Sequence, residues 1–196
     1  LASILKKKHL RRRENKLRTL GEVQFAHLES RDEILSHLPT FFDQHIGRRA
    51  MAGDKSQFRG EPARNFYRFL VEELDPRREL RFSVLALNQR PIAYHFGFEM
   101  NCKFVAYTPT FDPELSAISP GEVLFRRLFE YAGSRGLREF DFTIGDESFK
   151  FRFANTIGRS FRLHVFPRGL RGFASRAYYR AKDRAKESTG VRRAIR

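Results

Sequence analysis

The chain has 196 residues, a formal net charge of +15 and a single cysteine, Cys102. This length is typical of one domain with its own hydrophobic core. One cysteine excludes an internal disulfide framework, and no His/Cys cluster has the spacing of zinc ligands. No apolar run approaches the roughly 18 residues that span a bilayer. We therefore expect one domain with extensions, in a reducing, cytoplasmic setting and without a metal.

The positive charge is concentrated at the two ends. Residues 1–21 contain eight Lys/Arg and one acidic residue, residues 168–196 contain ten and two, and residues 22–167 contain twenty of each sign. We predict a basic linker helix over 1–21, a domain over 22–167 and a basic helical tail over 168–196. The chain begins at Leu1 inside a helical pattern, so we expect a missing N-terminal segment. Four interpretations of these basic ends stay open: solvated helix faces, or contact with an acidic partner, with lipid headgroups or with RNA.

The first half of the chain is predicted to be mainly helical. Residues 4–20 form a basic helix, 23–28 a short strand, and Ser30-Arg-Asp-Glu33 a capping box before a helix that Pro39 could break. Residues 48–64 form a loop. Pro62 then opens a helix that Pro76 ends. The predicted buried side of this helix is Phe66, Phe69, Leu70 and Leu74.

After this helix the hydrophobic residues recur at every second position, which is typical of strands. Residues 80–87, 92–100 and 103–110 predict an antiparallel meander with tight turns. Ser119-Pro-Gly-Glu122 opens a helix that Gly133 and Gly136 close. Residues 140–144 predict a strand parallel to 103–110, because a helical crossover joins the two. Residues 161–166 predict a last strand.

This order of elements resembles the GNAT acyltransferase fold. The resemblance is carried by residues 88–93, 107–113, 119–121 and 136–145 and by Phe149-Lys150, and Asp141-Phe-Thr-Ile-Gly145 is its most specific part. These segments look like the CelD-like or BioF2-like branch, which is related to the Fem peptidyltransferases. The resemblance covers residues 6–167. Similar members of this branch have two GNAT-like halves, and this chain resembles the second half. It implies an α+β fold with a mixed, mostly antiparallel sheet, flanking helices and splayed parallel strands at the centre.

The resemblance also implies acetyl-CoA or another acyl-CoA as co-substrate. The thioester would lie where strands 103–110 and 140–144 splay, because free main-chain groups there can pair with a pantetheine arm. The pyrophosphate would lie at the start of the following helix, where amides and the helix dipole favour anions. Here the chain has one glycine and a carboxylate, so a plain helix start is the alternative. The predicted donor-binding residues are Ala106, Tyr107, Thr108, Ser119, Gly121, Glu122 and Val123.

Acyl transfer requires a base for the acceptor and often an acid for the leaving thiolate. His95 shares a strand face with the small residues Ala93 and Gly97 and is a candidate base, with a structural histidine as the alternative. Asp112 is a second catalytic candidate, since it follows the strand whose end faces the thioester. Lys150 is the third, and a solvated lysine is its alternative.

Four further residues are predicted to contact the acceptor: Asp141, Gly145, Glu147 and Phe149. For Asp141, fixing the adjacent loop is the alternative. Phe149 stands where the resemblance leads us to expect a tyrosine, so it lacks a hydroxyl that could protonate the thiolate.

Three functions follow from these features. The leading one is direct transfer of an acyl group from coenzyme A to an amine or hydroxyl of a small-molecule or saccharide acceptor. A Fem-like transfer from aminoacyl-tRNA is the second, with the basic ends holding RNA; nucleic acid is otherwise not an expected partner. The third is a non-catalytic half that shapes an acceptor site or binds a partner.

Overall fold

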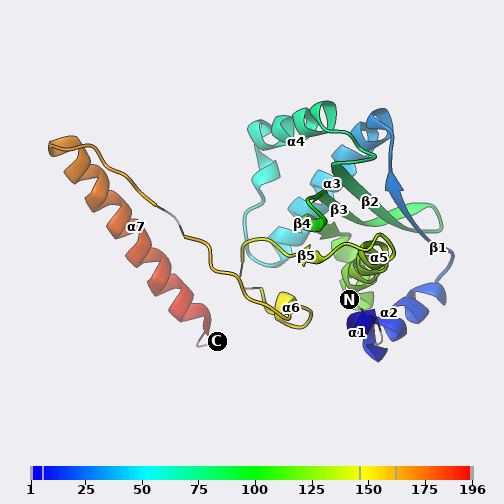
Figure 1. Ribbon diagram of the computed structural model, residues 1–196. Coiled ribbons are helices and arrows are strands. Elements are labelled where there is room, and N and C mark those ends of the chain that lie inside the picture. Colours follow the sequence, from blue (N-terminus) through cyan, green and yellow to red (C-terminus); the bar gives the residue numbers. More distant parts are fainter. Residues whose placement is uncertain (1, 6, 146, 162, 195–196) are drawn as a thin grey trace. The chain divides into compact units, whose positions relative to one another are not determined.

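The computed structural model describes residues 2–5, 7–145, 147–161 and 163–194. The chain divides into two compact units, Leu1–Asn155 and Thr156–Arg196, and each is described by itself. Within the described residues, five strands form one sheet in the order β1-β2-β3-β4-β5 (Figure 1). They are β1 (Val23–Leu28), β2 (Leu80–Leu87), β3 (Arg90–Met100), β4 (Lys103–Phe111) and β5 (Glu139–Asp141). The first four pair antiparallel, and β5 runs parallel to β4.

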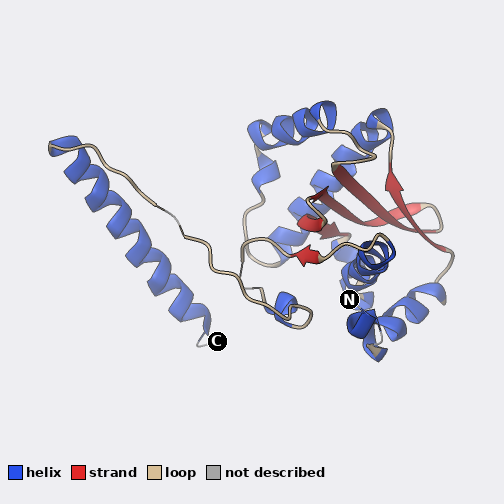
Figure 2. Cartoon of the chain, viewed as in Figure 1, coloured by secondary structure: helices blue, strands red, loops and turns tan. Residues whose placement is uncertain are grey.

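Helices cover both faces of this sheet (Figure 2). One face carries α1 (Ala2–Leu5), α2 (Lys8–Arg18) and α5 (Pro120–Ser134). The other carries α3 (Arg31–Met51) and α4 (Glu61–Glu73). Short turns of helix are η1 (Gln57–Arg59), η2 (Pro113–Ile118) and α6 (Ser148–Phe151). The predicted α+β class and the parallel strand after a helical crossover are confirmed.

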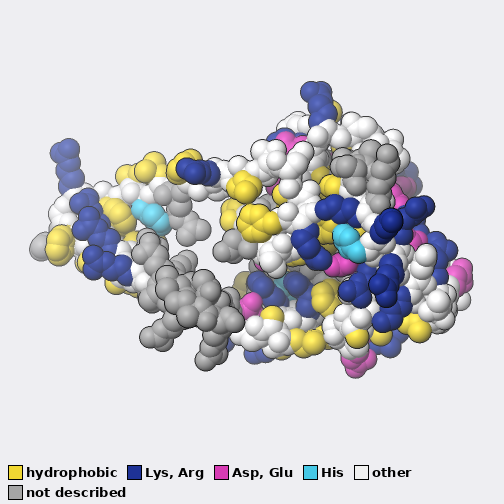
Figure 3. Space-filling view, turned by 90° about the horizontal axis from the view of Figure 1, so that it is seen from below, with side chains coloured by type: hydrophobic (Ala, Val, Ile, Leu, Met, Phe, Trp, Pro, Cys, Tyr) yellow, Lys and Arg dark blue, Asp and Glu magenta, His cyan; other side chains and the backbone are white. Residues whose placement is uncertain are grey.

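The basic helix α2 is packed into the first unit. Leu10 and Leu17, seven residues apart on one helix face, are both fully buried in the cluster that contains α5. Glu14 lies between them and forms ion pairs with Arg126 and Arg127 of α5. Helix α2 is therefore part of the first compact unit. Its opposite face is basic, and Figure 3 shows Lys and Arg side chains gathered on this side of the unit.

The second face of the sheet is covered by an aromatic core. The ring of Phe41 on α3 lies 5.8 Å from Phe82 and 6.2 Å from Phe96, centroid to centroid. This packing explains why α3 continues through Pro39, which the sequence indicated as a possible break. Pro39 is on the exposed side, and burial of the neighbouring turn offsets the roughly 3 kcal/mol cost of a helical proline.

Helix α4 presents a different side from the one predicted. Tyr67 and Val71 are buried, at 1% and 0% exposure, whereas Phe66 and Phe69 are 50% and 53% exposed. The prediction of Phe66 and Phe69 as core residues is wrong because α4 is apolar on more than one side. Hydrophobic spacing alone does not decide which stripe faces the sheet.

The second unit contains α7 (Leu170–Ala194) and an extended segment before it. The predicted strand over 161–166 is wrong for the described residues, none of which is in a strand. Phe161, Leu163 and Val165 alternate as a strand requires, yet they are 83–90% exposed. Alternation yields a strand only where a neighbouring strand supplies hydrogen bonds. Among the described helices, none combines the length and the hydropathy needed to cross a membrane.

The packing of α2 predicts that Leu10 within the helix and Leu20 just after it differ sharply in their contribution to stability. Leu10→Ala should lower the free energy of unfolding by about 2–5 kcal/mol, because it leaves a cavity against α5. Leu20→Ala, at a residue that is 51% exposed, is the matched control and should cost less than about 0.5 kcal/mol. Urea unfolding followed by circular dichroism measures both. Equal effects would contradict the placement of α2 in the core.

Candidate active site

The parallel strands β4 and β5 pair over only three residues. The last pair joins Val105 to Asp141, whereas β4 continues to Phe111. The segment 106–111 of β4 therefore extends past its parallel partner and leaves a gap on that side. The predicted splay between these strands is observed, and it begins before Thr108.

A turn after β5 produces this gap. Thr143 has a φ of 60°, and the Thr143 amide donates a 2.7 Å hydrogen bond to the Asp141 carboxylate. A threonine in the left-handed region cannot continue a strand. This contact ends β5 at Asp141 rather than at the predicted Ile144, and it shows Asp141 fixing the adjacent loop.

A β-bulge lies on β4 where the gap opens. The partners of β4 shift from Val105↔Phe98 to Thr108↔Phe96, so two residues, Ala106 and Tyr107, oppose Gly97 alone. Gly97 is required there, because a Cβ atom would lie 2.3 Å from the Val105 carbonyl oxygen. A bulge takes a residue out of the regular ladder and redirects its backbone groups. Tyr107 at this bulge is 42% exposed.

Helix α5 begins beside the end of β4. Gly121 packs on the Phe111 ring, where a Cβ atom would lie 3.1 Å from a ring carbon. Ser119, the residue before the helix, has a φ of 56°, and its carbonyl accepts from the Glu122 amide at 3.0 Å. Val123 in the first turn is fully buried. The predicted donor-phosphate residues are thus next to the gap.

The Glu122 carboxylate is held by two arginines at this helix start. Arg152 lies 2.8 Å from one carboxylate oxygen, and Arg13 lies 3.8 Å from the other. The arginines come from the segment after α6 and from α2. Two cations and one anion therefore occupy the place where the helix dipole favours a negative ligand.

A chain of side-chain hydrogen bonds reaches β4 from the opposite face of the sheet. Gln57 donates to the Tyr67 hydroxyl at 3.2 Å, and Tyr67 and Thr108 share a hydrogen bond of 2.6 Å. Burial raises the pKa of Tyr67 above its ordinary value. Tyr67 therefore stays a neutral donor. The sequence interpretation missed it, because Tyr67 is one aromatic residue among several on α4.

His95 lies deep in the core on the α5 side of the sheet. Its side chain is 0% exposed and stacks on Phe104 with ring centroids 5.1 Å apart. Nδ1 lies 3.5 Å from the Ser83 hydroxyl, which also bonds His27 at 2.9 Å. A Cβ atom at Gly97 would meet the His95 ring at 2.4 Å, so the small neighbour does not create a free space. This placement favours the structural alternative for His95.

Asp112 and Lys150 are both engaged in local contacts. The Asp112 carboxylate accepts from the Glu114 amide at 3.0 Å, which caps η2, and pairs with Arg90 at 2.6 Å. Lys150 pairs with Glu147 at 2.8 Å and donates to the Ile144 carbonyl at 2.9 Å. Lys150 thereby closes the loop after β5. A Cβ atom at Gly145, where φ is 134°, would lie 2.2 Å from the Glu147 carboxylate.

Phe149 is a packing residue in this structure. Its ring lies 5.4 Å from Phe125 and 6.3 Å from Phe142, centroid to centroid. These rings belong to the cluster between α5 and β5. A hydroxyl near the gap is therefore supplied by Thr108 and Tyr67 rather than by residue 149.

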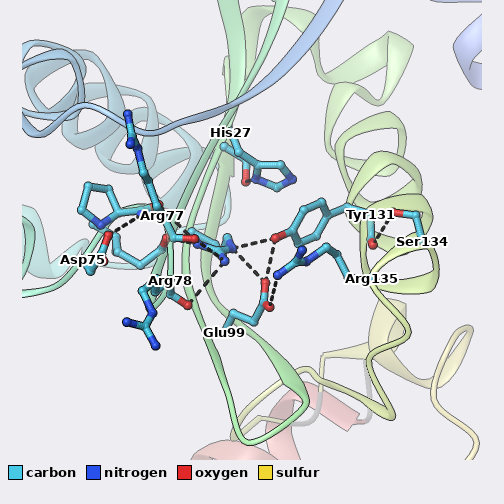
Figure 4. A network of polar contacts seen from close by, with 12 residues as sticks. His27, Asp75, Arg77, Arg78, Glu99, Tyr131, Ser134 and Arg135 are labelled. Carbon is cyan, nitrogen blue, oxygen red and sulfur yellow. Dashed lines mark hydrogen bonds and ion pairs between the residues drawn. The ribbon is translucent and has the colours of Figure 1, made fainter.

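The far end of α5 is anchored by a polar network (Figure 4). Tyr131 donates to Glu99 at 2.7 Å, and Arg81 donates to the same carboxylate oxygen at 2.9 Å. Arg135 approaches the other oxygen at 3.5 Å. Because Arg81 and Glu99 lie on β2 and β3, the network fixes α5 to the sheet. A hollow of about 550 Å³ between α2 and α5 lies apart from the gap.

Two buried histidines, His45 and His95, and the partly buried His27 predict a pH dependence of stability. Burial lowers the pKa of His27 and His45 to about 4 and that of His95 to about 3. In the unfolded chain each titrates near pH 6.5, so acid favours unfolding as the pH falls below that value. The free energy of unfolding should therefore fall with falling pH. His95→Leu should reduce the slope of this free energy against pH by about 1 kcal/mol per pH unit between pH 6 and 5. Urea unfolding across this range measures it. The exposed control His9→Leu should keep the wild-type slope, and an unchanged slope in His95→Leu would contradict a neutral buried ring.

Comparisons with known proteins agree with this architecture. The family described as acetyltransferase (GNAT) domain matches residues 6–151. Among curated proteins, none matches the sequence. The PaiA N-acetyltransferase of Thermoplasma acidophilum, solved with coenzyme A, is 13% identical with a TM-score of 0.51, and the alignment covers 67% of this chain and 86% of that one. At this identity the likeness shows the fold alone.

Two other solved structures have lower TM-scores. The ribosomal-protein-S18-alanine N-acetyltransferase of Escherichia coli is 18% identical with a TM-score of 0.42; the alignment covers 59% of this chain and 63% of that one, which is less than two thirds of its length. A possible acetyltransferase of Clostridium difficile 630 is 10% identical with a TM-score of 0.49, over 76% and 99% of the two chains. The family match covers most of the sequence, and the chain therefore belongs to the GNAT acetyltransferase family.

Proposed function

We propose that this domain transfers an acyl group from coenzyme A to an amine or hydroxyl of an acceptor, with the donor in the gap between β4 and β5. The observation that carries the proposal is the end of parallel pairing at Val105 and Asp141, six residues before β4 ends. Main-chain groups of 106–111 on that side can receive a ligand that pairs like an added strand. The complex of the Thermoplasma relative with coenzyme A supports this choice of donor.

The residues around the gap fit such a donor. The bulge at Ala106 and Tyr107 frees backbone groups from the ladder, and a free amide can hold an acyl oxygen as negative charge develops on it. An acyl thioester supplies the activated acyl group and a thiolate leaving group. Arg13 and Arg152 lie at the start of α5, where they can bind the donor phosphates together with the helix amides.

The polar chain on the other face supplies a hydrogen-bond donor. Gln57 donates to Tyr67, so Tyr67 is free to donate to Thr108, and the Thr108 hydroxyl is free to donate toward the gap. We assign to Thr108 a hydrogen bond that stabilises the leaving thiolate, with Tyr67 as its positioning residue. Lys150 orders the loop after β5, and Asp112 positions η2. We assign the base that deprotonates the acceptor to neither residue.

Finer features of the function are part of this proposal. The resemblance to the CelD-like or BioF2-like branch favours a saccharide or polysaccharide precursor as the acceptor and a preceding GNAT-like half as a partner. A cytoplasmic location is consistent with acyl-CoA as the donor. Asp141, Gly145, Glu147 and Phe149 lie in or next to the loop after β5, which would border the bound acceptor.

A second candidate is transfer from aminoacyl-tRNA. The basic outer face of α2 favours it, as does the Glu122 carboxylate at the helix start. Salt-sensitive retention of tRNA without any effect of acetyl-CoA would favour this function. If the protein bound neither tRNA nor acetyl-CoA, the result would favour a non-catalytic half.

Acetyl-CoA should raise the thermal midpoint of the protein, because a ligand that binds only the folded state stabilises it. Glu122→Gln should tighten acetyl-CoA binding by about threefold to tenfold, since it removes a carboxylate that repels the phosphates. Arg152→Gln should weaken binding by a similar factor of about threefold to tenfold. Titration calorimetry measures both. Absence of a thermal shift would contradict the proposed donor, and unchanged affinities in both variants would place its phosphates elsewhere.

Thr108→Val should lower the turnover rate by roughly 100-fold, since it removes the hydroxyl donor. The dissociation constant for acetyl-CoA should change by less than about threefold, because binding relies on main-chain groups. Thr110→Val is a matched control on the same strand, because the Thr110 hydroxyl is buried without a partner among the described residues. Thiol release from acetyl-CoA, with an acceptor that supports wild-type turnover, measures the rates. Equal rates for the two variants would exclude Thr108 as the donor.

A further inference from the structure

Two adjacent arginines lie at the carboxyl end of β4, on the face opposite α5. Arg48 and Arg49 are in the last turn of α3, and the preceding Gly47 packs against Pro113, directly after β4. The Arg48 guanidinium lies 5.8 Å from the centroid of the Phe111 ring. Both arginines are therefore near the end of the strand that borders the gap.

Part of their hydrogen-bonding capacity is unused. The Nε atoms of Arg48 and Arg49 are buried without a hydrogen-bond partner among the described residues. Arg49 pairs with Asp54 at 3.3 Å. A partly buried guanidinium whose Nε group lacks a partner is costly, and a bound anion would relieve that cost.

Helix capping does not account for the two side chains. The carbonyls of Arg48, Arg49 and Ala50 already accept hydrogen bonds from the amides of residues 52–54. The end of α3 is therefore satisfied by its own backbone. The guanidinium groups remain available for another partner.

Charged residues from two segments act on Arg48 and Arg49. Burial lowers the pKa of Arg48, and the neighbouring Arg49 lowers it further, while Glu147 opposes them. Burial would raise the pKa of Glu147, yet Lys150 and Arg49 lower it. Glu147 and Lys150 come from the loop after β5, on the other side of the gap. Charges from both sides of the gap therefore interact at this point.

We infer that Arg48, assisted by Arg49, binds a carboxylate or phosphate group of the acceptor. The inference rests on the proposed function, which places the donor phosphates at the start of α5. Since α3 and α5 cover opposite faces of the sheet, we place the acceptor on the α3 side of the thioester. A guanidinium binds carboxylate and phosphate through two parallel hydrogen bonds, which also orients the ligand. The acceptor is thus an anionic molecule with an amine or hydroxyl group.

The test measures thermal midpoints of the whole chain with acetyl-CoA at saturation, so that the donor phosphate site is already filled. Potassium phosphate or sodium acetate then replaces sodium chloride at constant ionic strength. We expect an additional rise of about 3 °C at a probe concentration tenfold above its dissociation constant. A larger rise with phosphate than with acetate would identify a phosphorylated acceptor, and the reverse would identify a carboxylate.

Three variants locate the site. Arg48→Gln should abolish the additional rise, and Arg48→Lys should retain part of it, because a lysine keeps the charge and loses the paired donors. Arg59→Gln, at an exposed arginine on the same side of the sheet, is the matched control and should behave as wild type. The retained effect of acetyl-CoA in each variant shows that the protein is folded and binds its donor.

Two results would overturn the inference. One is the absence of any rise from phosphate or acetate beyond that of acetyl-CoA, or the same rise in Arg48→Gln. The other is competition, in which phosphate reduces the effect of acetyl-CoA and Arg48→Gln weakens acetyl-CoA itself; the arginines would then belong to the donor site. If acetyl-CoA has no effect while phosphate stabilises through Arg48, the proposed donor is wrong and the anion site stands.

Discussion

The short parallel pairing between β4 and β5 is the constraint on which the rest of the structure depends. Three residue pairs join the strands, and the Asp141–Thr143 turn then separates them. Unpaired main-chain groups inside a sheet are unfavourable unless a ligand or water receives them. The domain keeps this opening because β4 is also paired along β3 and supported by helices on both faces. The separation is thus built into a rigid frame.

The two helical layers supply different groups to the gap. On one side, α5 is held at its far end by Tyr131 and Glu99 and along its length by Glu14 of α2, so its first turn is fixed beside Phe111. On the other side, the aromatic core orients Tyr67 toward Thr108. In the function that we propose, the donor phosphates bind on the α5 side, and a hydroxyl donor and an anion site lie on the α3 side.

Much of the fold follows from local patterns in the sequence. Alternation over 80–87, 92–100 and 103–110 identifies three strands, and the turns at 88–89 and 101–102 have the positive φ angles expected of two-residue hairpins. The parallel strand follows from the helical crossover. Its end does not, because a threonine with positive φ has no sequence signal. The burial of α2 in the core is also not evident from the sequence, because the helix has many charged residues and only two buried leucines.

The candidate site was only partly predictable. Residues on contiguous stretches, such as Ala106 to Thr108 and Ser119 to Val123, lie next to the gap, because strand and helix boundaries fix their positions; their role in donor binding stays a prediction. Contacts between distant segments were not visible. Tyr67 and Thr108 are 41 residues apart, and Arg48 lies in a segment that was predicted as a loop. His95 was predicted as a candidate base because its neighbours on the strand face are small. Small neighbours do not show whether a helix covers that face.

Hydrogen–deuterium exchange tests the opening between β4 and β5 most directly. We expect the amides within 106–111 that do not pair with β3 to exchange readily in the free protein and to become protected when acetyl-CoA is added, while those of β1 (Val23–Leu28) keep their rates. Protection of these unpaired amides before any ligand is added, or no protection at saturating acetyl-CoA, would contradict a donor bound along the free side of β4.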